Sequence, residues 1–123
     1  MDTRAKKISV LGTEYTVRFV EAWQDKYIDK MNYGGYCSAD SHEIYILLLK
    51  THEEWKDEPE EKIEHLQRTT LRHEIVHAFL NESGLRWNSF TPDSAWARNE
   101  EMVDWVAIQF PKLLKAFEQA DAL

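Results

Sequence analysis

The chain has 123 residues, of which 43% are hydrophobic, and a formal net charge of −7. This length predicts one domain, residues 1–123, that folds around a single core. The acidic charge argues against a nucleic-acid partner and against anionic membranes, which both attract basic surfaces, and no apolar run approaches the roughly 18 residues of a membrane span.

The first third of the chain has the pattern of β-structure. The segment Tyr15–Val20 alternates apolar and polar residues, which is the period of a half-buried strand. Gly12 suits a hairpin turn between this strand and a strand at residues 8–11. Residues 23–32 are mixed and charged, and they predict a loop or a short helical turn.

Two more strands are expected before the first long helix. Residues 34–38 predict a short strand, and after a turn His42–Leu49 predicts the next one. Cys37 is the single cysteine, so the chain has no internal disulfide, which fits a reducing cytoplasm. We expect this cysteine to be a small buried apolar residue rather than a nucleophile.

A long helix is predicted from about Pro59 to Ser83. Proline at the first helical position, followed by acidic residues, favours a helix start. Gly84 favours a helix end at the other side of the segment. The sequence therefore predicts an α+β fold, in which a small antiparallel or mixed sheet of about 3–4 strands packs on this helix and a second long one.

The second helix is expected from Ala95 onward, capped by Ser94 or Asp93. Pro111 interrupts the pattern, so we expect a kink or a fresh short helix there. Apolar residues recur at three- and four-residue intervals, which predicts one buried face. These residues are Val103, Val106, Phe110, Leu113, Leu114 and Phe117.

The first long helix contains an H-E-x-x-H motif, formed by His73, Glu74 and His77. Histidines four residues apart leave the same face of a helix one turn apart. Two neutral imidazoles at this spacing can hold one Zn²⁺ at about 2.0–2.1 Å. Glu74 is placed to act as a base for a water on the metal. The alternative is a solvated helix face with two unrelated histidines, which the apolar neighbours of the motif disfavour.

The second helix carries Glu100 and Asp104, four residues apart. Two acids at this spacing repel each other slightly unless a cation lies near, and the alternative is an ordinary solvated helix turn. An H-E-x-x-H motif followed on the next helix by N-E-x-x-x-D resembles the gluzincin metallopeptidase pattern. The resemblance implies that Glu100 is the third zinc ligand and that Asp104 supports a ligand histidine.

Residues 100–107 also resemble the E-x-x-A-[ND]-x-F-A segment of the ImmA/IrrE metallopeptidase family, and the strands before the first long helix are similar to that family too. The chain also resembles small phage and prophage proteins that carry both motifs. The chain departs from the family at Val103, where alanine is preferred, and at Val106, where phenylalanine is usual. The resemblance implies a single zincin-like domain and a zinc peptidase of restricted specificity that acts on a protein or peptide.

The ligand set predicts how such an enzyme would work. Two histidines and one carboxylate leave Zn²⁺ an open position for water, and Glu74 takes the proton of this water as it attacks a peptide carbonyl. The predicted strand His42–Leu49 would lie along the cleft and pair with an extended substrate. An oxyanion donor is also required, and Tyr36, Tyr45 and His42 are the candidates.

Two other functions are compatible with the motif. A metal-bearing binding or regulatory protein would keep the site and cleave nothing. The small size of the chain favours this function, because few residues are available to form the walls of a substrate cleft. A SprT-like DNA-associated protease resembles the H-E-x-x-H helix, but that class brings a third histidine and a basic or zinc-ribbon tail. The tail here, residues 112–123, has no cysteine. The peptidase is the function that we expect.

Overall fold

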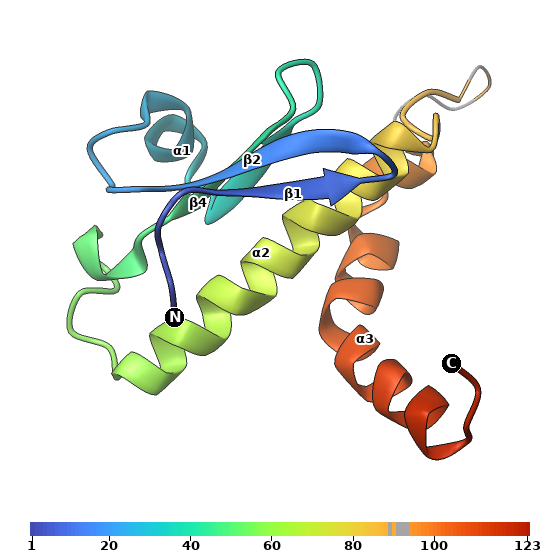
Figure 1. The fold of residues 1–123 in the computed structure, drawn as a ribbon. Helices are drawn as coiled ribbons and strands as arrows, with labels where there is room; N and C mark the ends of the chain where they lie inside the picture. Colours follow the sequence, from blue (N-terminus) through green and yellow to red (C-terminus); the bar gives the residue numbers. More distant parts are fainter. Residues whose placement is uncertain (89, 91–93) are drawn as a thin grey trace.

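A computed structural model describes residues 1–88, 90 and 94–123 (Figure 1). The strands form one sheet in the order β1-β2-β4-β3. They are β1 (Lys6–Val10), β2 (Thr13–Val20), β3 (Gly35–Ser38) and β4 (Glu43–Leu47). The sheet is mixed, because β1–β2 and β3–β4 pair antiparallel whereas β2–β4 pair parallel.

Two of the helices are long. The helices are α1 (Lys26–Met31), α2 (Glu60–Glu82) and α3 (Glu100–Gln119), with short 3-10 turns η1 (Leu49–Thr51) and η3 (Trp96–Arg98). Together with the four-stranded mixed sheet, they confirm the predicted α+β class. None of the helices in the described part of the chain is both long and apolar enough to cross a membrane.

The core lies between the sheet and α2, which runs along one face of the sheet (Figure 1). Its fully buried members come from β1, β2, β4 and α2: Val10, Tyr15, Val17, Ile44, Ile46 and Ala78. The alternation of β2 thus places Tyr15 and Val17 on the helix side, as the sequence predicts. Leu71 and Ile75 of α2 pack against the same cluster, so the apolar residues around the H-E-x-x-H motif fix this helix on the sheet.

The β1–β2 connection is a two-residue hairpin turn. Val10 pairs with Thr13, and the two residues between them both have positive φ, 50° at Leu11 and 88° at Gly12. Positive φ at both central residues is the geometry whose twist matches the flanking strands, and glycine adopts it without a steric penalty. The predicted turn at Gly12 is confirmed.

The segment 23–32, predicted as a loop or a short helical turn, contains α1. Asp25 caps this helix, because its side chain accepts hydrogen bonds from the backbone N–H groups of Tyr27 and Ile28. Ile28 is buried in a second cluster, with Leu47, Leu49 and Ile63. This cluster fixes α1 beside β4 and the start of α2.

The strand predicted over His42–Leu49 is shorter and lies elsewhere in the sheet than expected. β4 ends at Leu47, and η1 follows from Leu49. β4 pairs with β2 on one side and with β3 on the other, so both of its edges are used. It cannot add a substrate strand, and that prediction is wrong. The edge strand on this side of the sheet is β3.

The second long helix begins at Glu100, five residues later than predicted. Asn99 is its cap, because the Asn99 side chain accepts from the Met102 N–H, and Ala95 lies before the turn η3. Ser94 is therefore not the cap, and Asp93 lies outside the described residues. Pro111 lies inside one continuous helix, so no fresh helix starts there.

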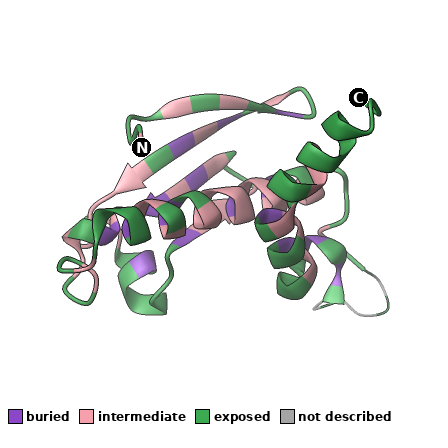
Figure 2. Ribbon diagram, turned by 90° about the horizontal axis from the view of Figure 1, so that it is seen from below, coloured by how far each residue is buried: buried purple, intermediate pink, exposed green. Residues whose placement is uncertain are grey.

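Only the first half of the predicted apolar face of α3 is buried. Val103 is fully buried, whereas Phe110 is 46% and Phe117 is 41% exposed. Figure 1 shows the reason, because α3 packs beside α2 at its start and then projects away from the sheet. The far half of α3 is mostly exposed (Figure 2).

Candidate metal centre

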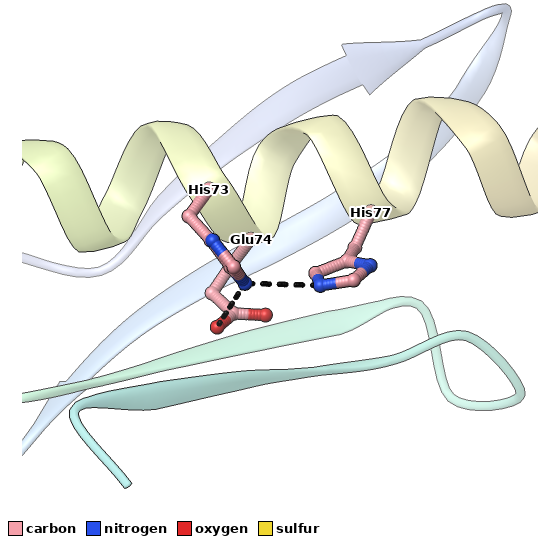
Figure 3. Close-up of side chains that lie close together, drawn as sticks. All are labelled: His73, Glu74 and His77. Atoms are coloured by element: carbon pink, nitrogen blue, oxygen red, sulfur yellow. Dashed lines mark hydrogen bonds and ion pairs between the residues drawn. The ribbon is translucent and has the colours of Figure 1, made fainter. Parts of the chain in front are cut away.

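Helix α2 brings His73, Glu74 and His77 together beside the β3–β4 strands (Figure 3). The Nε2 atoms of His73 and His77 lie 3.0 Å apart. Donor atoms of all three residues lie within 4.8 Å of one another, a grouping that can hold a metal ion. The four-residue spacing of the histidines therefore produces the expected convergence on one face of the helix.

Glu100 reaches the same point from the first turn of α3. One carboxylate oxygen lies 3.0 Å from His73 Nε2, and the other lies 3.2 Å from His77 Nε2. In a tetrahedral zinc site with bonds of about 2.0–2.1 Å, neighbouring ligand atoms are about 3.3 Å apart. The two nitrogens and the Glu100 carboxylate thus have nearly the spacing of three ligands around one ion.

The other ring nitrogen of each histidine is bound elsewhere. His77 Nδ1 lies 2.6 Å from the carbonyl oxygen of Ala97, and His73 Nδ1 lies 2.7 Å from an oxygen of Asp104. A carbonyl or an ionised carboxylate only accepts, so each Nδ1 carries the hydrogen and each neutral ring has a lone pair on Nε2. Two such lone pairs facing each other at 3.0 Å repel, and a cation between them removes the repulsion. The donor set therefore fits a metal such as zinc.

Glu74 is near this point but is placed differently from Glu100. Its side chain is buried, and its nearer oxygen lies 4.0 Å from His73 Nε2. Burial raises the pKa of the Glu74 carboxyl to about 7; His73 and a hydrogen bond from the Cys37 backbone N–H oppose the shift, and Glu100 adds to it. Although Glu74 belongs to the compact group of donors, Glu100 contacts both Nε2 atoms and is the better third ligand. Glu74 lies beside these contacts as a buried carboxyl.

None of the three predicted oxyanion donors has a free donor at this centre. The Tyr36 hydroxyl donates to Asp25 at 2.9 Å, and the Tyr45 hydroxyl donates to Glu43 at 2.5 Å. His42 Nε2 lies 3.6 Å from an oxygen of Glu82, and His42 is not among the residues that line the cavity at the metal group. Of the three, Tyr36 lines the cavity beside the metal group, and there its hydroxyl is already engaged.

Cys37 was predicted to be a small buried apolar residue, and it is partly buried against the core. Burial raises its pKa to about 12, so the thiol stays protonated near neutral pH. Its side chain packs against the core beside α2. Cys37 also lines the cavity that contains Glu74.

A cavity of about 750 Å³ extends from the metal group, and two of its lining residues, Arg86 and Arg98, had not been predicted. Arg98 stands two positions before Glu100 and directly after Ala97, whose carbonyl holds His77. The sequence alone does not single out Arg98, because an exposed arginine between two helices is common. Only the fold places it beside the metal group.

No family model, curated protein or solved structure matches this chain. The structure brings together all five residues predicted for the site: His73, His77, Glu100, Glu74 and Asp104. The zincin-like fold and the resemblance to ImmA/IrrE metallopeptidases stay predictions from the sequence.

Proposed function

We propose that this protein is a zinc-dependent peptidase of restricted specificity, related to the ImmA/IrrE-like metallopeptidases. One observation carries the proposal. His73, His77 and Glu100 converge with separations of 3.0–3.2 Å, and a buried carboxyl that is not a ligand lies beside them. This is the arrangement that hydrolysis at a metal requires, with three protein ligands, an open position and a base.

A bound Zn²⁺ would act as a Lewis acid that lowers the pKa of water to about 7 and polarises the scissile carbonyl. Glu74 takes the proton of the attacking water and delivers it to the leaving amine. In the metal-free chain, burial raises the pKa of this carboxyl to about 7, which is the range that suits a group that accepts and returns a proton. Asp104 and the Ala97 carbonyl hold the two rings with Nε2 toward the ligand point.

The substrate is proposed to bind along β3. This strand is at the edge of the sheet, and edge strands present unpaired backbone groups that can pair with an extended peptide. Cys37 of β3 binds Glu74 through its backbone N–H, so the edge runs next to the base. A peptide paired here would bring its carbonyl to the metal group.

A second candidate is a metal-bearing binding protein that cleaves nothing. Its support is the engagement of the expected oxyanion donors Tyr36 and Tyr45 with other side chains. A SprT-like protease has less support, because the metal group found among the described residues contains two histidines and no third.

Substitution of Glu74 separates enzyme from binder. Glu74→Gln keeps the shape of the side chain but cannot accept a proton, so it should retain zinc and lose cleavage by at least about a hundredfold. Wild type and Glu74→Gln are expressed in the same cells, and protein fragments are compared by mass spectrometry. Glu101→Gln is the matched control, because Glu101 is an exposed neighbour of the ligand Glu100.

Fragments present with wild type and with Glu101→Gln, but absent with Glu74→Gln, support the peptidase. Identical fragment profiles from all three proteins, in cells where the protein exerts its biological effect, leave the metal-bearing binder. Zinc content measured on the same preparations shows whether a silent variant still holds the metal.

A further inference from the structure

The cavity beside the metal group has two chemically different walls. Three tyrosines, Tyr27, Tyr33 and Tyr36, line it together with Arg86 and Arg98. Figure 1 shows α1 toward the start of α2, whereas the segment after α2 that carries the arginines lies toward its end. The tyrosines come from α1, β3 and the residues between them, and the arginines come from the segment after α2, so the cavity has an aromatic wall and a basic wall.

The basic wall is organised around Trp87. The guanidinium carbon of Arg98 lies 4.8 Å from the centre of the Trp87 ring, and that of Arg86 lies 5.4 Å from it. Arg86 is neutralised by Asp40, with a nitrogen–oxygen distance of 2.8 Å. Arg98 forms no ion pair with any residue that the structure describes. Stacking on an indole orients a guanidinium and leaves the N–H groups at its edge free to bind a ligand.

Arg98 is also fixed by its place in the chain. Ala97, on one side of it, binds His77 through its carbonyl, and Asn99, on the other side, caps α3. Both neighbours are therefore tied to the metal group. An arginine held in this way keeps its position relative to the ligands, as a substrate-binding residue must.

We propose that Arg98 binds a carboxylate of the substrate, so that the peptide taken by this cavity carries an acidic side chain or a terminal carboxylate on the side facing the basic wall. The proposal rests on the proposed peptidase function and names its substrate class. A guanidinium fork matches a carboxylate with two parallel hydrogen bonds. None of the described residues neutralises the charge of Arg98, so this charge would draw the acidic end of the peptide toward the cavity.

The test measures binding, so it does not depend on cleavage. Zinc-loaded Glu74→Gln is incubated with a library of short peptides, and the retained peptides are sequenced. We expect Asp and Glu to be enriched at least about fivefold at one position. Adding Arg98→Gln should abolish the enrichment, whereas Arg4→Gln should not, because Arg4 is an exposed arginine outside the cavity. Libraries with free and amidated C-termini distinguish a terminal carboxylate from an acidic side chain.

A library without acidic enrichment, or an enrichment that survives Arg98→Gln, overturns the carboxylate site. Cleavage of the retained peptides by wild type tests the peptidase separately. Acidic peptides that bind through Arg98 and are never cleaved would leave the site standing and remove the enzyme. Peptides that are cleaved without any preference for acidic residues would support the enzyme and remove the carboxylate site.

A different observation concerns Arg72, which precedes the first histidine. Its Nε donates to the carbonyl oxygen of Ala107 in α3 at 2.7 Å. In a regular helix this carbonyl would accept from the backbone N–H of residue 111, four positions on. That residue is Pro111, which has no N–H. Pro111 therefore frees the carbonyl that Arg72 binds.

This contact lies beside the metal group. Glu100, Asp104 and Ala107 are separated by four and three residues, so they share one face of α3. Asp104 holds His73 on the same face. We infer that Arg72 is a positioning residue, which fixes α3 along α2 through the carbonyl exposed by Pro111 and so holds Glu100 and Asp104 at the histidines. This inference rests on the metal centre and not on the peptidase.

A double-mutant cycle tests this contact. Arg72→Met should weaken zinc binding about tenfold, measured by competition with a chromophoric chelator. In a Pro111→Ala background the same change should weaken it no more than about threefold, because the helix then supplies the missing donor to the carbonyl. Arg72→Lys, which keeps a donor, should recover part of the loss. Arg68→Met is the control, since Arg68 pairs with Glu64 one turn earlier and should be additive with Pro111→Ala.

Urea unfolding of the same variants separates positioning from general packing. If Arg72→Met lowers stability but leaves zinc affinity unchanged, Arg72 only packs the helices. Equal losses of zinc affinity in both backgrounds would show that Pro111 and Arg72 do not act on one carbonyl. Either result overturns the inference.

Discussion

At the residue scale, the two histidines are held by partners of different kinds. His77 is oriented by the backbone carbonyl of Ala97, which no side-chain substitution removes, whereas His73 is oriented by the Asp104 carboxylate. A carboxylate partner fixes the tautomer of the ring and raises the basicity of its other nitrogen. His73 is therefore the ring whose properties depend on a second side chain.

The choice between two adjacent glutamates is the first prediction at this scale. Glu100 and Glu101 project about 100° apart on a helix, so only one of them can face the histidines. Because Glu100 contacts both Nε2 atoms, Glu100→Ala should weaken zinc binding by at least about a hundredfold, and Glu101→Ala should change it less than about threefold. Isothermal titration with zinc measures both variants. A larger loss for Glu101→Ala would contradict the assignment.

The raised pKa of Glu74 predicts how the stability of the metal-free protein depends on pH. The carboxyl has a pKa of about 7 when folded, because of its burial, against about 4.5 otherwise. Between these values the unfolded chain releases this proton first, so the free energy of unfolding falls as the pH rises from about 4.5 to 7. The loss from this group is at most about 3 kcal/mol.

Glu74→Gln removes this titration. Its free energy of unfolding, measured with urea in the presence of a chelator, should equal that of wild type near pH 4.5 and exceed it at pH 8. All other titratable groups are common to both proteins, so the difference between the two curves reports on Glu74. Parallel curves across this range would show that Glu74 titrates normally in the folded chain.

At the scale of elements, the close approach of β3 to α2 determines the position of the cavity wall that β3 forms. A Cβ atom on Gly35 would lie 2.7 Å from the carbonyl oxygen of Tyr45 and 3.1 Å from Thr70 Cγ2 of α2. Only glycine fits between the neighbouring strand and the helix. This packing brings the Cys37 N–H to Glu74, so the edge strand and the base are set by one contact.

Gly35→Ala should therefore destabilise the protein by about 1–3 kcal/mol, because β3 must move away from α2 and β4. Gly34→Ala is the matched control, since its Cβ would meet Thr70 at 3.5 Å, an ordinary contact. Urea unfolding of the two variants measures the difference. If both cost the same, the space at Gly35 is not what limits the approach of the strand.

At the scale of the whole molecule, the metal group joins two helices that are otherwise in contact over part of their length. His73 and His77 lie on α2 and Glu100 lies on α3, whose far half projects away from the sheet. An ion held by all three would tie the start of α3 to α2. Zinc should thus stabilise the fold as well as serve the chemistry.

Zinc at about 100 times its dissociation constant should raise the free energy of unfolding by about 2.7 kcal/mol. The shift should appear as a higher melting temperature that a chelator reverses, measured by differential scanning calorimetry. His77→Ala should lose the shift, because it removes a ligand, whereas His65→Ala should keep it, since His65 is an exposed residue of α2. A shift that persists in His77→Ala would place zinc elsewhere.

The sequence by itself determined the features that depend on local geometry. Helical periodicity places His73 and His77 on one face whatever surrounds them, and the alternation of β2 selects the residues that face the core. The hairpin at Gly12, the α2 helix and the α+β class follow from the same short-range rules. The predicted site residues, from His73 to Asp104, are brought together by two such helices.

Only the tertiary structure decided the features that depend on partners distant in sequence. β4 lies between β2 and β3, so β3 is the edge strand, and a strand pattern does not state its place in the sheet. Phe110 and Phe117 of the apolar face of α3 are exposed because α3 packs beside α2 at its start and then projects away from the rest of the fold (Figure 1). Arg98 gains a role only where the fold sets it beside the ligands. The physical reason is that strand order, burial and convergence are set by long-range packing, which local propensity does not encode.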